Sequence, residues 1–178
     1  DEIVRLVSSN ASFTEKHPEG LSKIDKVEET LSAYSGLSEE EVLEAIVNET
    51  DYKLVNFSNA YEFIDEFKVQ NALHNADINW SFLKNKSWYP LNLEDQVISV
   101  ITNRPLCSVA TNFLELSETK FKVFVADKAL LQRVISIVEG LENDAQEASE
   151  ELEKIRALAS ETPVVNLVNS FISRSLDL

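Results

Sequence analysis

The 178-residue sequence contains only three glycines, and this scarcity excludes the common nucleotide-binding motifs. Gly20, Gly36 and Gly140 stand far apart, and none begins a loop that ends in Lys-Ser or Lys-Thr. Phosphate-binding loops and dinucleotide-binding turns need closely spaced glycines, because the backbone must approach the phosphates. This stretch of sequence therefore has no P-loop, and we expect it to hydrolyse no ATP and to bind no cofactor.

Histidine and cysteine are equally scarce. His17, His74 and Cys107 give no metal-ligand spacing. His74 has no companions, so we interpret it as a surface or capping histidine, and we interpret Cys107 as a small buried hydrophobe. A single cysteine also excludes an internal disulfide framework and agrees with a reducing compartment. We predict no catalytic residue and no metal site.

Basic residues are few relative to acidic ones. Lys and Arg number 16 against 31 Asp and Glu, which gives a net charge of −15. Such a surface repels phosphate backbones and anionic lipids, so we expect no nucleic-acid binding and no polybasic membrane attachment. The sequence has no apolar run long enough to span a bilayer and no signal segment. We expect a soluble, cytoplasmic protein without direct membrane insertion. Methionine is absent even at position 1, which suggests a fragment or a processed chain.

The first 84 residues have mainly helical patterns. Residues 1–25 are interrupted by polar and turn-forming residues, and we expect a loosely ordered arm there. Residues 26–84 predict a helical subdomain, in which Gly36 ends one helix with a left-handed cap. Ser38 and Glu41 predict a capping box at the start of the next helix. A third helix is expected to bury the apolar residues Tyr61, Phe63, Ile64, Phe67 and Val69.

Residues 85–142 predict a small α+β subdomain. Ser87 to Leu93 and Val97 to Thr102 are typical of a hairpin with a polar turn. A helix from Leu106 to Leu116, an alternating strand at 121–125 and a helix from about 128 to 141 follow. The residues expected on the inner face of the first of these helices are Val109, Phe113 and Leu116. The predicted fold class is α+β, with a three-stranded sheet in the order strand, strand, helix, strand, helix, and with helices on one face.

The sequence closes with an acidic connector and an amphipathic helix. Residues 143–160 contain few large apolar groups, and we interpret them as a helical or partly ordered connector. Thr162 can cap a helix over residues 161–178 that begins at Pro163. Its apolar face consists of Val164, Leu167, Val168, Phe171 and Ile172. We interpret this segment as the first helix of a following domain, on which that face should pack.

Two groups of residues leave alternatives open. Trp80, Trp88 and Tyr89 flank the change from helices to strands, where core packing is the simpler interpretation and a partner-anchoring tryptophan is the sharper one. The acidic run Glu39 to Glu41 is most simply a solvated helix face, but it is also a candidate docking site for a cationic partner.

Three segments together resemble a known family. Pro163 to Asn169 matches a Pro-Val-Val-x-Leu-Val-Asn pattern, Ser87 to Leu91 is similar to a Tyr-x-x-x-Pro-Leu hairpin, and Gly36 to Leu43 is similar to a helical opening. In this order they resemble the N-terminal region of type II secretion and type IV pilus assembly ATPases, the secretion protein E family. The resemblance implies a non-catalytic docking and regulatory domain that precedes the motor. ATP and Mg would then belong only to the motor domain.

The resemblance also implies partners. Domains of this kind bind the cytoplasmic domain of an inner-membrane platform protein and recruit a hexameric motor peripherally to the bacterial inner membrane. We expect the partner contacts to include Glu40, Glu44, Tyr61 and Phe63, together with contacts to the chain's own ATPase domain and to sister subunits.

A ligand-sensing role is the alternative that the resemblance offers. Some relatives bind cyclic di-GMP through an Arg-Leu-Gly-x-x-Leu-x-x-x-Gly motif followed by spaced leucines. Alignment on Gly36 places Val27, Glu28 and Glu29 where Arg-Leu-Gly would stand, and only Gly36 and Leu43 agree with the pattern. Because the basic residue that should face phosphate is missing and two acids follow its position, we hypothesise that the dinucleotide is not bound.

Overall fold

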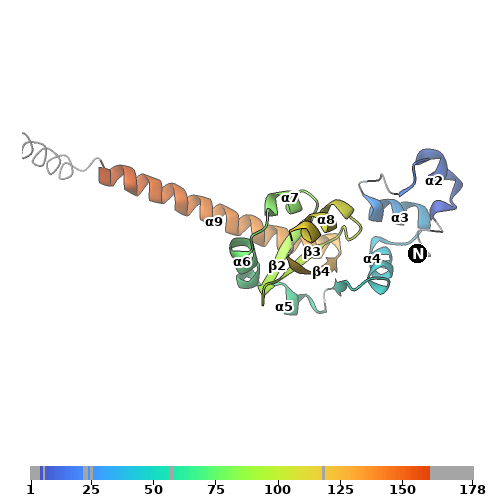
Figure 1. Cartoon of the computed structure of the whole chain (residues 1–178), viewed down its shortest axis with the longest axis horizontal. Helices are drawn as coiled ribbons and strands as arrows, with labels where there is room; N and C mark the ends of the chain where they lie inside the picture. The colour runs from blue at the N-terminus through green and yellow to red at the C-terminus, as the bar shows by residue number, and fades with distance from the viewer. Residues whose placement is uncertain are drawn as a thin grey trace, which may run out of the picture. The chain divides into compact units, whose positions relative to one another are not determined.

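A computed structural model describes residues 5, 7–21, 24, 26–56, 58–117 and 119–160, except for the side chains of residues 61, 159 and 160. The chain divides into two compact units, Asp1–Val138 and Glu139–Leu178. The predicted α+β class is confirmed, because helices surround a mixed sheet in the first unit (Figure 1). The predicted division into five segments stays a prediction.

Three helices open the described chain: α2 (Ala11–Lys16), α3 (Val27–Ser35) and α4 (Glu39–Asn48). One buried cluster joins Phe13, Leu31, Val42 and Ile46 of these helices to Val7, which precedes them. Among the described residues of this part, Asn10 caps α2, and Val7 and Phe13 contribute core side chains. Both predicted caps are confirmed: Gly36 ends α3 with a φ of 77°, and Ser38 forms a capping box at the start of α4.

The sheet has four strands rather than the predicted three, in the order β1-β4-β3-β2. The extra strand is β1 (Lys53–Val55), which the sequence analysis treated as part of an apolar connection. It pairs in parallel with β4 (Lys120–Ala126). A strand of three residues shows no period, and its pairing joins residues about 70 positions apart, so local sequence carried no signal for it.

The predicted hairpin is confirmed as β2 (Trp88–Glu94) and β3 (Val97–Thr102), which pair antiparallel. Asp95 and Gln96 both have positive φ, at 50° and 62°, as a two-residue type I′ turn requires. Pro90 fits because β2 is an edge strand of the sheet.

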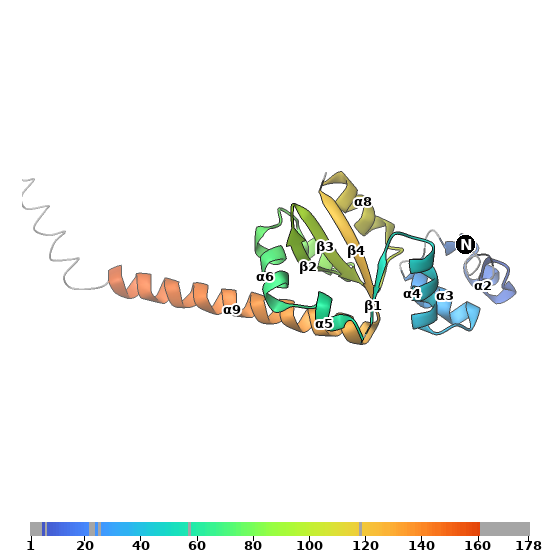
Figure 2. The same ribbon diagram turned by 90° about the horizontal axis from the view of Figure 1, so that it is seen from below.

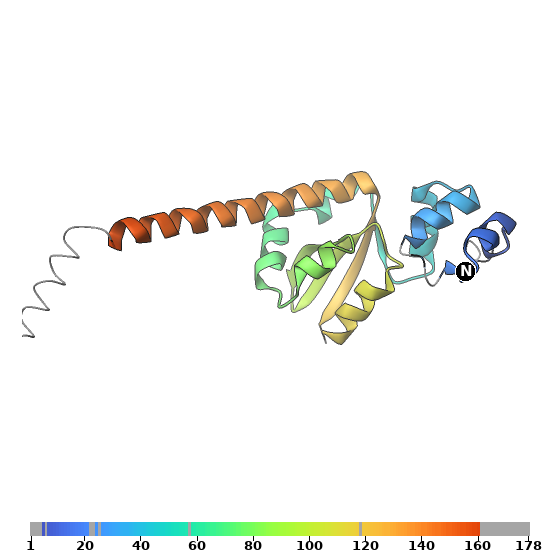
Figure 3. The ribbon, with the colours of Figure 1, turned by 90° about the horizontal axis from the view of Figure 1, so that it is seen from above.

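Helices cover both faces of the sheet, whereas one covered face was expected (Figure 2, Figure 3). The helix α8 (Ser108–Leu116) lies on one side and connects the parallel strands β3 and β4. The helix α9 (Lys128–Ser160) begins on the other side, where Leu130, Val134 and Val138 are buried. A parallel connection needs such a crossover helix, and alternate strand residues bury apolar groups on both sides.

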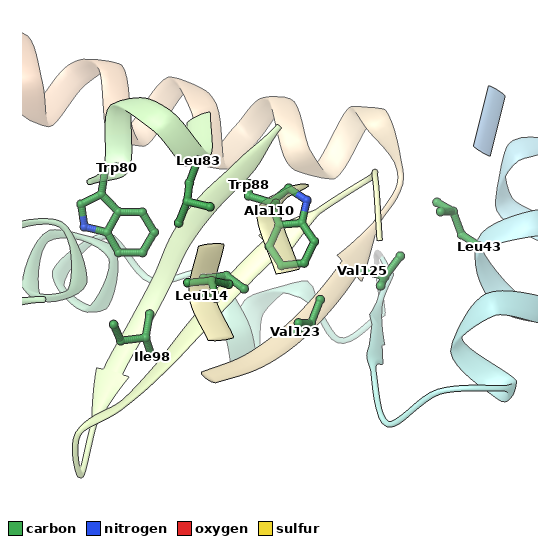
Figure 4. Packing of buried hydrophobic residues seen from close by; sticks show 10 residues of the cluster. Leu43, Trp80, Leu83, Trp88, Ile98, Ala110, Leu114, Val123 and Val125 are labelled. Atoms are coloured by element: carbon green, nitrogen blue, oxygen red, sulfur yellow. The ribbon is translucent and has the colours of Figure 1, made fainter. Parts of the chain in front are cut away.

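One core cluster lies between the sheet and the helices α4, α7 (Trp80–Lys84) and α8 (Figure 4). Trp88 is fully buried there, and its indole Nε1 donates a 3.1 Å hydrogen bond to the carbonyl oxygen of Arg104. Trp80 is also buried. Core packing is therefore the right interpretation of both tryptophans, and neither offers an exposed partner anchor.

In the second unit, α9 continues from Glu139 to Ser160, where the described residues end. The segment 143–160, predicted as an acidic connector, is therefore helical. Among the described residues, no helix is long and apolar enough to cross a membrane.

Candidate docking surface

The acidic helix α4 has a buried face and an exposed face. Val42, Leu43 and Ile46 are buried, and their helical spacing places them on one face of the helix that begins at the capping box. Glu40 and Glu44 are exposed on the opposite side, one turn apart. The structure thus separates the core face of this helix from its solvent face, which the sequence alone did not do.

Glu41 belongs to the cap and not to a binding surface. Its Oε2 accepts hydrogen bonds from the Ser38 backbone N–H at 2.8 Å and from the Ser38 hydroxyl at 2.9 Å. The backbone hydrogen bond from Ser38, followed by that from its hydroxyl, lowers the pKa of Glu41. This carboxylate therefore remains charged and committed to the helix start.

Glu40 and Glu44 have no such internal role. Within the part of the chain that the structure describes, neither forms a hydrogen bond or an ion pair. Two unpaired carboxylates at i and i+4 repel each other mildly in the free protein. A cationic side chain placed between them would remove that repulsion, so the pair is suited to an external basic group.

The structure describes the side chain of Phe63 but not that of Tyr61 among the two aromatic candidates. Phe63 ends α5 (Ala60–Phe63) and is half-buried, with its ring centroid 5.1 Å from that of Phe124 on β4. It serves the core on the α9 side of the sheet. Tyr61 falls within α5, and its side chain lies outside the described structure. The predicted inter-domain residues Val164, Leu167, Val168, Phe171 and Ile172 lie outside the described residues.

A further acidic residue, Glu28 on α3, is buried at 4% exposure. Its Oε1 accepts a 2.7 Å hydrogen bond from the backbone N–H of Leu106, in the segment before α8. Burial raises the pKa of Glu28, while the hydrogen bonds from Leu106 and from its own backbone and the charge of Arg104 oppose the rise. Glu28 therefore ties the N-terminal helices to the α+β part. Its helical position alone did not reveal this role.

Exposed apolar side chains are a second feature that the sequence analysis missed. Phe67 is 82% exposed because Asp65 caps a new helix, α6 (Glu66–Asn75), which buries Val69 and Ala72 instead. The single helix that was expected to bury Tyr61 to Val69 is in fact two helices, α5 and α6. Asp65, a good N-cap residue, is the sequence signal for this break.

The helix α8 is rotated relative to its predicted orientation. It buries the small Ala110 and Leu114, whereas Leu116 is 84% exposed and Val109 is also exposed. Phe113 is half-buried and stacks near Phe82, with 4.6 Å between ring centroids. The close approach of α8 to the sheet favours alanine on its inner face, so the expectation that Val109 and Leu116 point inward was wrong.

The described residues include no group of three or more His, Cys, Asp or Glu side chains that could hold a metal ion. His74 is exposed, with Nδ1 3.0 Å from the carbonyl oxygen of Gln70. Cys107 occupies the N-cap position of α8 and is half-buried against the core. These positions agree with structural roles for both residues.

Comparison with known proteins adds a likeness of fold. No protein-family model and no curated protein matches the chain. A structure of MshE with cdg is similar at a TM-score of 0.51 and 13% identity, covering 78% of this chain and 87% of that one. The N-terminal domain of XpsE is similar at a TM-score of 0.44 and 15% identity, covering 74% and 86%. Both proteins are type II secretion or type IV pilus ATPases. The likeness to the MshE structure, at 13% identity, shows a shared α+β fold and agrees with the family resemblance of the sequence.

Proposed function

We propose that this chain is a non-catalytic docking domain that binds a basic surface of a partner protein through the exposed face of α4. The observation that carries the proposal is the pair Glu40 and Glu44, which are exposed and have no internal partner among the described residues. Other acids of the same region are already engaged, Glu41 in the cap and Glu28 at Leu106.

The charge of the whole chain supports the same choice of partner. A net charge of −15 attracts a cationic protein surface over about one Debye length, roughly 10 Å at 0.1 M salt, and speeds encounter. The two carboxylates of α4 would then fix where the partner docks. The fold supports a place beside a secretion or pilus motor, and the partner we propose is the cytoplasmic domain of its inner-membrane platform protein. This would recruit the chain, with its ATPase domain and sister subunits, to that membrane.

The ligand-sensing alternative has less support. The Arg-Leu-Gly positions of the cyclic di-GMP motif hold Val27 in place of the arginine, then Glu28 and Glu29. Glu28 is buried and hydrogen-bonded to Leu106, and Glu29 pairs with Lys26 at 2.9 Å. Leu43 belongs to the core. A ligand with two phosphodiester groups would meet carboxylates at this helix, so we propose that no cyclic dinucleotide binds and that the domain needs no cofactor.

The test is a binding titration between the 178-residue chain and the cytoplasmic domain of the cognate platform protein, without nucleotide. The double variant Glu40→Lys/Glu44→Lys should weaken binding about tenfold, because each reversal removes a surface ion pair worth about 0.2–1 kcal/mol and adds repulsion. The affinity of the native chain should also fall as salt rises.

The matched control is Glu66→Lys/Asp77→Lys. It changes the net charge equally, at two other exposed positions, and Glu66 like Glu40 lies in the first turn of a helix. Its affinity should remain within about twofold of the native value if docking is local to α4. Equal loss of affinity in both double variants would show that net charge alone drives binding and would contradict docking at α4. Absence of binding by the folded native chain would refute the docking function.

A further inference from the structure

The helix α9 carries a strict heptad pattern over more than three repeats. Its apolar residues alternate three and four positions apart, whereas a lone surface helix follows a period of 3.6. These residues are Leu131, Val134, Val138, Leu141, Ala145, Ala148, Leu152 and Ile155. A sustained 3.5-residue period is the sequence signal for packing against another helix.

Leu141 is still buried, but from Ala145 onward the pattern has no cover among the described residues. Leu152 is 54% exposed and Ile155 is 57% exposed, and Ala145 and Ala148 are exposed as well. We call these four residues the α9 seam. Two large apolar side chains on one helix face, in line with two alanines, form a stripe that water solvates poorly.

The shape of the α9 seam indicates what fits it. In heptad packing each side chain inserts between four residues of the facing helix. Ala145 and Ala148 leave room for large side chains of a partner, while Leu152 and Ile155 fill the spaces beyond them. A partner helix should therefore present large apolar residues opposite the two alanines.

The charge beside the seam selects the kind of partner. The positions that flank the seam on one side are Asp144 and Glu151, and both are exposed and acidic. The other flank contains Ser149 and Arg156. A second copy of this chain would bring one basic flank residue, Arg156, together with further acids to an already acidic helix. Basic residues at both flank positions of a different helix would neutralise Asp144 as well as Glu151.

We propose that the α9 seam binds an amphipathic helix of another protein, with large apolar residues at heptad spacing and basic residues along the flank that meets Asp144 and Glu151. This surface is separate from α4 and does not depend on the docking function proposed above. It gives the second unit a binding role of its own.

A designed peptide tests the proposal directly. The probe is a three-heptad helix with leucine at the two core positions and lysine at both flanking positions, and the comparison peptide has glutamate at the flanks. The lysine peptide should bind the 178-residue chain at least tenfold more tightly than the glutamate peptide. The variant Leu152→Ser/Ile155→Ser should weaken that binding at least tenfold, whereas the outer-face control Glu150→Ser/Glu153→Ser should stay within about threefold.

All four substituted side chains are exposed, so the variants should fold as the native chain does. Circular dichroism verifies this. Equal weakening by the two double variants would show attraction by charge alone and overturn the proposal. Absence of binding would also overturn it. So would hydrogen exchange that shows residues 145–155 already protected without peptide, or a mass that rises with concentration and falls in the seam variant, since either would mean that this chain itself covers the seam.

Discussion

Replacement of Glu28 tests the tie between the N-terminal helices and the α+β part. In Glu28→Ala the backbone N–H of Leu106 loses its acceptor at 2.7 Å, and a small cavity opens on α3. Loss of a hydrogen bond to a charged group, with a donor left poorly satisfied, costs about 1–3 kcal/mol of unfolding free energy. Glu28→Gln keeps an oxygen that can accept from Leu106, so its unfolding free energy at pH 7 should lie within about 1 kcal/mol of the native value.

The pH dependence has a definite sign. Burial raises the folded-state pKa of Glu28 above its ordinary value of 4.5, so the folded protein disfavours ionisation of this carboxyl relative to the unfolded chain. Its contribution to stability is fully present below pH 4.5 and is lost as the pH rises through the folded-state pKa. The glutamine variant does not ionise there. The native protein should therefore lose stability relative to Glu28→Gln as the pH rises from the unfolded-state value towards neutrality.

Urea denaturation followed by tryptophan fluorescence, at several pH values, measures both effects. The control is Glu29→Gln on the same helix, whose ion pair with Lys26 is largely exposed and should contribute at most about 1 kcal/mol. If Glu28→Ala unfolds with the native free energy, the tie contributes nothing. If the native protein gains stability over Glu28→Gln as the pH rises, the reasoning from burial is wrong.

Four further outcomes follow from the same structure. Trp88→Ala should cost about 3–5 kcal/mol in urea denaturation, because it empties a fully buried site, and a loss below 1 kcal/mol would contradict that placement. Ser38→Ala should cost about 1 kcal/mol by removing one side of the capping box, and an unchanged midpoint would argue against the cap. Phe67→Ser should change stability by less than about 0.5 kcal/mol, since its ring is exposed, and a large loss would place that ring in the core. Isothermal titration with cyclic di-GMP should show no binding, and micromolar or tighter affinity would restore the sensing role.

The elements that sequence reasoning found are those with a local signal. The hairpin β2–β3 has two alternating runs around a polar turn, and the start of α4 has both partners of a capping box within four residues. The strand β1 has neither, since its stability comes from parallel pairing with β4, far along the chain. Only the tertiary structure could reveal it.

The orientation of α8 shows a different limit. The large residues Val109, Phe113 and Leu116 define an apolar face by size, yet the structure buries Ala110 and Leu114. Packing against a sheet rewards close approach as well as apolar area, and a small residue permits that approach. A rule that ranks faces by the bulk of their side chains will misjudge such helices.

The acidic residues of α3 and α4 differ in their surroundings more than their sequence indicates. In the sequence Glu28, Glu40 and Glu44 are equivalent carboxylates on helices, and only Glu41 is distinguished, by its capping box with Ser38. The structure gives them three conditions: Glu28 is buried on a backbone N–H, Glu41 caps its own helix, and Glu40 and Glu44 face solvent without an internal partner among the described residues. Only Glu40 and Glu44 can form an ion pair with another molecule without losing internal hydrogen bonds. A partner selected by charge should therefore respond to Glu40 and Glu44, whereas changes at Glu28 and Glu41 should act first on the stability of the fold.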